Sequence, residues 1–170
     1  SCGEKLLLKS IDKIGYQKQS ADRYALEPII ESFAEFDKFS GKTVLEIGVG
    51  LGADHQRYAE DGALLSGIDL TNRAIEHTRN RFNYLGLESN LRVDDAENID
   101  FCDNTFDLVY SWGVIHHTHN TPKAVSEIFR ILKPGGRAKI MIYHKWSIVG
   151  FMLWFRYGLL ALNPRLSLAD

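Results

Sequence analysis

Residues 43–52, TVLEIGVGLG, decide the fold of this 170-residue chain. A short, mostly apolar run breaks into three glycines at alternate positions, with Glu46 just before them. The pattern predicts a strand over 43–47, a glycine-rich turn, and a helix from Ala53 to about Asp61. Such a turn brings bare backbone amides to a helix N-terminus, where a nucleotide-like ligand can approach without meeting a Cβ atom.

An acid after the next apolar run strengthens this interpretation. Residues 64–68 are predicted to form the second strand, and Asp69 follows them. It stands about 20 residues past the first glycine, the spacing at which a βαβ unit delivers a carboxylate to a ribose diol. The glycines alone do not identify the cofactor, because Gly48, Gly50 and Ala53 also fit the G-x-G-x-x-G/A fingerprint of nicotinamide enzymes.

Strand and helix patterns alternate along the rest of the chain. Residues 1–20 lack clear periodicity. A helix is expected from Ala21 to about Phe36, started or kinked by Pro28, and another, capped by Thr71, runs through Tyr84. Two strands follow at 90–93 and 106–110. The chain then continues with a helix that Thr121-Pro122 begins and that runs through Leu132, a Pro134-Gly135-Gly136 turn, and a strand at 137–143. Near-continuously apolar strands alternating with helices predict an α/β fold with a doubly wound, mainly parallel sheet covered on both faces.

The chain has no repeats or low-complexity linkers, so a single domain is expected over residues 1–170. Within it we expect an N-terminal helical lid region at 1–40, a cofactor-binding core at 41–144 and an apolar helical tail at 145–170. The net charge of -2 gives no electrostatic footprint for nucleic acid. Cys2 and Cys102 fit no metal spacing, and two lone thiols suggest a reducing compartment, which we take as cytoplasmic.

Several features follow one another in a fixed order. The E-x-G-x-G-x-G turn and Asp69 are followed by VDDAENIDF at 93–101, FDLVYSWGVIHH at 106–117 and EIFRILKPGG at 127–136. This order resembles the class I (Rossmann-like) S-adenosylmethionine-dependent methyltransferases, particularly the small-molecule group called type 11. The resemblance runs from about Tyr16 to the C-terminus. It implies S-adenosylmethionine as cofactor, S-adenosylhomocysteine as product and a small-molecule methyl acceptor.

The resemblance also implies roles for individual residues. The glycine turn would pack against the methionine moiety and the ribose, and Asp69 would accept hydrogen bonds from both ribose hydroxyls. Asp95 would accept from the adenine amine, and Glu46 would bind the methionine ammonium or order the turn. Glu97 either contributes to the site or caps the following turn. The whole set expected at the cofactor is Glu46, Gly48, Gly50, Gly52, Asp69, Leu70, Asp94, Asp95, Ala96, Glu97, Ser111, Trp112 and Gly113.

Methyl transfer from a sulfonium is a direct displacement, so a base is needed only where the nucleophile must lose a proton. His117 is the first candidate for a base and His116 the second, with Tyr143 and His144 also near the predicted strand ends. The H-H-x-H spacing that His119 completes is poor for a tetrahedral zinc site, and no metal is expected.

Three alternatives stay open: a methyltransferase, a non-catalytic module that binds S-adenosylmethionine or S-adenosylhomocysteine, and a nicotinamide-dependent oxidoreductase. Family members continue past the fifth strand with a helix and two further strands, whereas this sequence stops at Asp170. Residues 148–162 are strongly apolar but interrupted by Arg156 and too short to span a membrane, which needs about 20 apolar residues. We expect this tail to be buried, for example in a symmetric homodimer.

Overall fold

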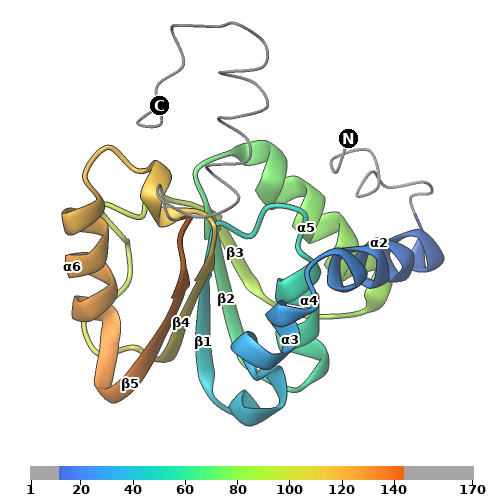
Figure 1. The fold of residues 1–170 in the computed structure, drawn as a ribbon, viewed down its shortest axis with the longest axis horizontal. Helices are drawn as coiled ribbons and strands as arrows, with labels where there is room; N and C mark the ends of the chain where they lie inside the picture. The colour runs from blue at the N-terminus through green and yellow to red at the C-terminus, as the bar shows by residue number, and fades with distance from the viewer. Residues whose placement is uncertain (1–11, 144–170) are drawn as a thin grey trace, which may run out of the picture.

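The computed structural model describes residues 12–143. Within them five strands form one sheet in the order β3-β2-β1-β4-β5, and every neighbouring pair is parallel (Figure 1). The strands are β1 Thr43–Ile47, β2 Leu64–Asp69, β3 Asn90–Val93, β4 Phe106–Trp112 and β5 Leu132–Met141. The predicted α/β fold with a doubly wound parallel sheet is confirmed.

Helices cover both faces of this sheet (Figure 1). The helical elements are α2 Lys13–Leu26, α3 Ile29–Ala34, α4 Ala53–Glu60, α5 Asn72–Leu85 and α6 Thr121–Ile131, with short 3-10 turns η1 Phe36–Phe39 and η2 Ile115–His117. In Figure 1, α6 lies on one side of the sheet, and the other labelled helices lie on the opposite side. None of the helices in the described part of the chain has the length and hydropathy needed to cross a membrane.

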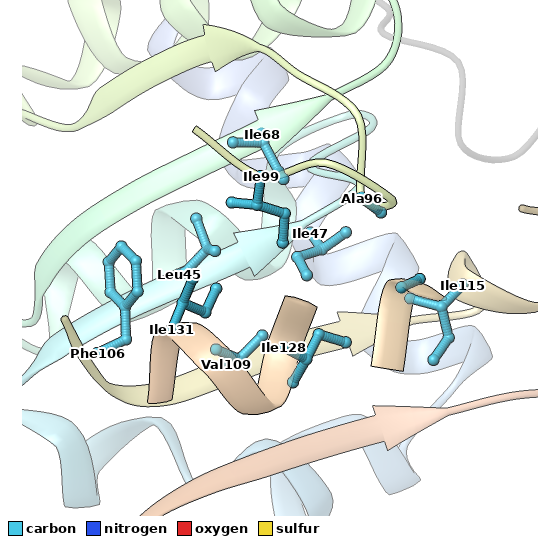
Figure 2. Close-up of a cluster of buried hydrophobic side chains, with 11 residues drawn as sticks. Leu45, Ile47, Ile68, Ala96, Ile99, Phe106, Val109, Ile115, Ile128 and Ile131 are labelled. Atoms are coloured by element: carbon cyan, nitrogen blue, oxygen red, sulfur yellow. The ribbon is translucent and has the colours of Figure 1, made fainter. Parts of the chain in front are cut away.

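Alternate strand residues supply two separate cores. On the α6 side, Leu45 and Val109 pack with Ile128 and Ile131 in the cluster drawn in Figure 2. On the other side, Val44 and Leu108 join a cluster that includes Tyr58 of α4 and Phe82 of α5. Because successive side chains point to opposite faces, a strand buried on both faces is apolar at nearly every position.

The order of the strands places a ligand site. β1 has β2 on one side and β4 on the other, so the chain reverses its direction of travel across the sheet between β1 and β4. Open α/β sheets bind ligands at such a point, outside the carboxyl ends of the strands. The glycine turn after β1 and the end of β4 both lie there.

Three predicted elements have boundaries that differ from the structure. The N-terminal helix starts at Lys13 rather than Ala21, because Asp12 caps it by accepting a hydrogen bond from the Gly15 N–H at 2.7 Å. It also ends at Leu26, so that the predicted 21–36 helix is two helices, with Pro28 at the start of the second.

The other two errors concern α6 and β5. Asn120, not Thr121, is the N-cap of α6, since its Oδ1 accepts from the Lys123 N–H at 3.1 Å. β5 starts at Leu132 rather than Arg137 and ends at Met141. The predicted Pro134-Gly135-Gly136 turn is instead an irregularity inside the β4–β5 pairing, whose register shifts between Phe106 and Leu108.

Candidate functional site

The glycine turn contains three residues that hold positive φ angles. These are 81° at Gly48, 51° at Gly50 and 73° at Gly52. A Cβ atom added to Gly48 would lie 2.3 Å from Val114 Cγ2, and one added to Gly52 would lie 2.8 Å from Thr78 Oγ1. The nearest atom to a Cβ at Gly50 is a backbone oxygen at 3.9 Å. Gly48 and Gly52 are therefore required for packing, whereas Gly50 faces open space.

Two cavities lie at the turn. The first has a volume of about 360 Å³ and the second about 310 Å³. Both are lined by Gly48, Gly50 and Val114, so they adjoin at the turn. The first reaches Glu46, α2, the start of α4 and Trp112, whereas the second reaches the end of β2 and the segment after β3. Of the predicted cofactor residues, the second cavity gathers Gly48, Gly50, Asp69, Leu70, Asp94, Asp95, Ala96 and Glu97.

Asp69 stands at the end of β2, half-buried at the second cavity. Its Oδ1 accepts from the Thr71 N–H and from the Thr71 hydroxyl, both at 2.9 Å, and its Oδ2 accepts from the Gly50 N–H at 3.2 Å. A carboxylate has about four acceptor positions. One position on Oδ2 is therefore left for a ligand, and a second becomes available if the Thr71 hydroxyl turns away.

The segment after β3 separates the two neighbouring aspartates by their partners. Asp94 uses both carboxylate oxygens to hold the local backbone, accepting from the N–H groups of Asp95 and Asp100 at 2.9 Å each. Asp95 is exposed, and its Oδ1 accepts from the Glu97 N–H at 2.9 Å. Asp95 is thus the better placed of the two to accept from a ligand. Glu97 accepts from the Asn120 N–H at 2.8 Å, which ties this segment to the start of α6.

Glu46 lies beneath the first cavity and is only 4% exposed. Its Oε2 lies 2.9 Å from Nδ1 of His55, which is fully buried on α4. Burial raises the pKa of the Glu46 carboxyl well above its ordinary value, and the Asp54 charge adds to this effect. Burial also lowers the pKa of His55 to about 3.

A second buried carboxylate joins α2 to the site. Arg23 of α2 donates two hydrogen bonds to Asp54 at the start of α4, from Nε at 2.9 Å and from Nη2 at 2.8 Å. The Tyr110 hydroxyl donates to the same carboxylate at 3.0 Å. Because Gln19, Arg23, Leu26 and Glu27 line the first cavity, α2 forms one of its walls.

Of the predicted residues at the end of β4, only Trp112 lines the first cavity. The buried Nε1 of Trp112 has no hydrogen-bond partner among the described residues. Ser111 is fully buried and donates to the Ile47 carbonyl at 3.2 Å, so it ties β4 to β1 and lines neither of the two cavities. Gly113 takes a φ of 70° and a Cβ there would lie 3.4 Å from the Tyr143 hydroxyl. Tyr143 itself lines the first cavity.

The two histidines predicted as bases lie in different places. His117 is exposed and lines the second cavity, beside Asp69 rather than beside Trp112. The His116 ring packs edge-on against Tyr143 with centroids 5.0 Å apart, and both of its nitrogens are buried without a partner among the described residues. Burial, with a smaller contribution from His117, lowers the pKa of His116. No group of three metal-ligating side chains occurs in residues 12–143.

Sequence reasoning missed three contributors, namely His55, Asp54 and the α2 side chains. His55 and Asp54 follow the glycine turn directly, and an ionisable pair in the first turns of that helix was a signal that could have found them. Arg23 carried no such signal, because its partner is 31 residues away.

The residues present fit S-adenosylmethionine. The open space at Gly50 admits a ligand that crosses the turn from one cavity to the other. Asp69 and Asp95 keep acceptor capacity that could serve a ribose and an adenine, and Glu46 offers a carboxyl group that could serve a methionine ammonium.

Comparison with known proteins gives concordant matches. Residues 45–140 match the family described as Methyltransferase domain. The chain is 38% identical over 122 residues to phosphoethanolamine N-methyltransferase 2 of Caenorhabditis elegans, covering 69% of this chain and 27% of that protein. It is 34% identical over 103 residues to phosphatidylethanolamine N-methyltransferase of Cereibacter sphaeroides, covering 59% and 50%.

A solved structure gives a similar result. The chain is 25% identical to a Methanococcus maripaludis protein described as a candidate S-adenosyl-L-methionine-dependent methyltransferase, with a TM-score of 0.62. The match covers 92% of this chain and 78% of that one. The chain spans between about a quarter and a half of the length of the two curated relatives.

Proposed function

We propose, from the premise that this chain belongs to the methyltransferase domain family, that it transfers a methyl group from S-adenosylmethionine to a small-molecule amine. The observation that carries the proposal is the pair of cavities that meet at Gly50, with acceptor groups for a nucleoside in one and carboxylates in the other. The family membership sets aside the nicotinamide alternative.

The bound cofactor would extend across the turn. We propose that Asp69 and Asp95 hold its ribose and adenine in the second cavity, with Leu70 and Ala96 as apolar walls. Glu46 would face its ammonium group in the first cavity. When bound, the cofactor supplies an electrophilic methyl group on a positively charged sulfur, and the protein's task is to align that methyl with the acceptor.

The charges around the first cavity favour an amine acceptor. Its described lining contains three carboxyl groups, on Glu27, Glu46 and Asp54, against one guanidinium, on Arg23. Arg23 is already paired with Asp54 at 2.8 Å and lies 3.4 Å from Glu27. Even with the Glu46 carboxyl neutral, Glu27 and Asp54 outnumber Arg23, so an acceptor whose reacting end is anionic would meet excess negative charge. The names of the two curated relatives likewise state that they are N-methyltransferases.

Aromatic side chains support the same acceptor class. Trp112 and Tyr143 both line the first cavity, and aromatic faces attract cations. An ammonium must lose a proton before its nitrogen can attack the methyl group. Of the two predicted bases we favour His116, because its ring contacts Tyr143 at the wall of this cavity and its lowered pKa keeps it neutral near pH 7. His117 is the less favoured base, since it lines the second cavity.

Transfer of labelled methyl from S-adenosylmethionine to matched acceptors tests the proposal. Ethanolamine and phosphoethanolamine are compared with ethylene glycol and glycolate, which present a hydroxyl or a carboxylate in place of the amine. We expect labelled amines and no labelled alcohol or acid, and we expect Glu27→Gln to raise the KM for amines. Binding of the cofactor without transfer to any acceptor would support a non-catalytic binding module instead, and failure to bind S-adenosylhomocysteine would overturn the whole proposal.

The proposed partners and cellular location of the protein rest on its net charge and its cysteines. We propose a small-molecule partner in the cytoplasm and no nucleic acid, because the chain carries a net charge of -2 and two lone cysteines. The homodimer expected through the apolar tail concerns residues 145–170, which lie outside the described residues. Light scattering at micromolar concentration tests it.

A further inference from the structure

A line of buried polar groups leads from the first cavity into the sheet. Glu46 Oε2 lies 2.9 Å from His55 Nδ1, and His55 Nε2 lies 2.8 Å from Ser89 Oγ. The Ser89 hydroxyl in turn donates to the Leu65 carbonyl at 3.1 Å. Glu46 is 4% exposed and His55 is fully buried, although Glu46 reaches the wall of the first cavity.

The direction of the Ser89 hydroxyl decides where the hydrogens of this line lie. When Ser89 donates its one hydroxyl hydrogen to the Leu65 carbonyl, Ser89 Oγ accepts a hydrogen from His55 Nε2. A neutral imidazole that donates from Nε2 is an acceptor at Nδ1. The short contact with Glu46 then requires a hydrogen on the carboxyl group.

With the Ser89 hydroxyl still donating to the Leu65 carbonyl, the other distribution consistent with these contacts is an imidazolium facing a carboxylate. The reference for counting is an ionised Glu46 beside a neutral His55. Both distributions carry one proton more than that reference, either on the Glu46 carboxyl group or on the His55 ring.

Charged groups on α2, α4, α5 and β2 act on this proton, and the Tyr24, Tyr58 and Tyr110 hydroxyls also lie within range of Glu46. Burial is the largest effect on the pKa of Glu46 and raises it. Asp54 of α4 and Asp69 of β2 raise this pKa further, whereas Arg23 of α2 and Arg81 of α5 lower it. Burial lowers the pKa of His55 as well. Both directions favour the neutral carboxyl and the neutral imidazole in the free protein, in agreement with the arrangement in which Ser89 donates to the Leu65 carbonyl.

We propose that Glu46 and His55 share one proton in the free protein, and that this proton is released to solvent when a ligand ammonium group binds beside Glu46. His55 is then a positioning residue that sets the charge of the Glu46 side chain. The inference rests on the proposed function, because S-adenosylmethionine and S-adenosylhomocysteine supply that ammonium group.

The release requires a rearrangement that the geometry permits. After the proton leaves, Glu46 is a carboxylate and needs a donor, which His55 supplies by carrying its hydrogen on Nδ1 instead of Nε2. His55 Nε2 then becomes an acceptor, and the Ser89 hydroxyl turns from the Leu65 carbonyl to donate to it. No heavy atom has to move, because a hydroxyl rotates about its own bond.

Calorimetric titration with S-adenosylhomocysteine in buffers of different ionisation enthalpy counts the proton. Measurements between pH 5.5 and pH 7 stay below the range of about 7.7–8.0 where an α-amino group titrates. We expect close to one proton released per ligand bound, and a Kd that falls up to tenfold for each unit rise in pH. Binding with no net proton release overturns the inference and leaves the proposed function intact, whereas absence of binding overturns the proposed function itself.

Variants assign the proton to its source. Glu46→Gln is expected to bind more weakly and to release no proton, and Ser89→Ala is expected to release less than the wild-type protein because His55 Nε2 loses its acceptor. His77→Gln, which removes a histidine on α5 that lines neither of the two cavities, is the matched control and should release as much as wild type. Proton release that persists in Glu46→Gln would overturn the assignment.

A spectroscopic readout distinguishes this role from a purely structural one. The ¹⁵N chemical shifts of the His55 ring report which nitrogen carries the hydrogen. We expect the hydrogen on Nε2 in the free protein at neutral pH and on Nδ1 after S-adenosylhomocysteine binds. An unchanged pattern on binding would overturn the switch.

Discussion

The Asp69 side chain shows how much a single carboxylate can contribute to cofactor binding. Three protein donors occupy its acceptor positions, and a ribose would add one or two more bonds of charge-assisted type. We predict that Asp69→Ala weakens S-adenosylhomocysteine binding by about 1.5–3 kcal/mol, the usual range for a hydrogen bond to a charged group. Calorimetric titration measures this, with the exposed Asp37→Ala as control. Unchanged affinity in a folded Asp69→Ala protein would contradict the assignment.

The glycines of the turn have different tasks, which two substitutions separate. Gly50 faces open space, so Gly50→Val is predicted to fold with a loss of about 1–2 kcal/mol from its positive φ and to lose cofactor binding. Gly48→Ala is predicted to destabilise the fold more, since its Cβ would lie 2.3 Å from Val114 Cγ2. Urea denaturation and titration of both variants measure the two effects. Normal binding by Gly50→Val would show that Gly50 does not contact the ligand.

Local pattern predicted these residues because the strand, the turn and the acid after the next strand are contiguous in sequence. The pairing of His55 with Glu46 was not predicted, since it depends on how α4 is rotated about its axis against β1. That rotation is set by tertiary packing, in which the His55 ring lies 5.0 Å from that of Phe82 and fills the space beside Gly67. The role of Ser89 is equally invisible, because it lies 34 residues from His55.

At the level of elements, α2 is held to the domain by polar contacts. Arg81 of α5 is fully buried and donates to Ser20, to Gln19 and to the Tyr16 carbonyl, while its guanidinium carbon lies 5.1 Å from the Tyr16 ring centroid. A helix that packs through polar side chains shows no apolar stripe. This is why residues 13–20 carried no helical period in the sequence.

The Arg23–Asp54 pair is predicted to be the main attachment of α2. Arg23→Met leaves Asp54 as a buried carboxylate with the Tyr110 and Tyr24 hydroxyls as its remaining described partners. We expect a loss near the lower end of the roughly 3–5 kcal/mol seen when one partner of a buried pair is removed, because Arg23 is partly exposed. Urea denaturation measures it. The double variant Arg23→Met/Asp54→Asn should recover part of the loss, and a double variant no more stable than Arg23→Met would contradict this account.

The attachment of α6 is predicted to weaken in acid. Glu127 accepts from the Ile99 N–H at 3.0 Å and from Arg130 at 2.7 Å. The Arg130 hydrogen bond lowers the pKa of Glu127 to about 2. Because the folded pKa lies below the unfolded value of about 4.3, this stability is present above pH 4.3 and is lost as the pH falls toward 2.

The matching variant is Glu127→Gln. It should be less stable than wild type by about 1.5–3 kcal/mol at pH 7, and the difference should shrink as the pH falls through the range from about 4.3 to 2. Urea denaturation at several pH values measures it, with the exposed Glu76→Gln as control. A difference that is independent of pH would show that the Glu127 charge does not contribute.

For the molecule as a whole, the site lies where the order of the strands reverses, so β1, β2 and β4 and the helices beside them all contribute to it. A ligand that binds there stabilises the folded state against a cooperative unfolding transition. The sequence could predict this location from the glycine turn and the acid after the second strand, but it could not predict the wall formed by α2, which depends on contacts across 31 residues.

We predict that S-adenosylhomocysteine at 100 times its Kd stabilises the wild-type chain by about 2.7 kcal/mol. For a domain of this length, 1 kcal/mol corresponds to roughly 2–4 °C in Tm, so Tm should rise by about 5–11 °C. NAD at the same concentration should leave Tm unchanged, because the turn and Asp95 would be matched to an adenosine without a pyrophosphate. Asp69→Ala should lose about half or more of the rise at that ligand concentration, since its higher Kd lowers the ratio of ligand concentration to Kd that sets the stabilisation. Scanning calorimetry measures all three, and an equal rise with NAD would contradict the cofactor assignment while leaving the fold unaffected.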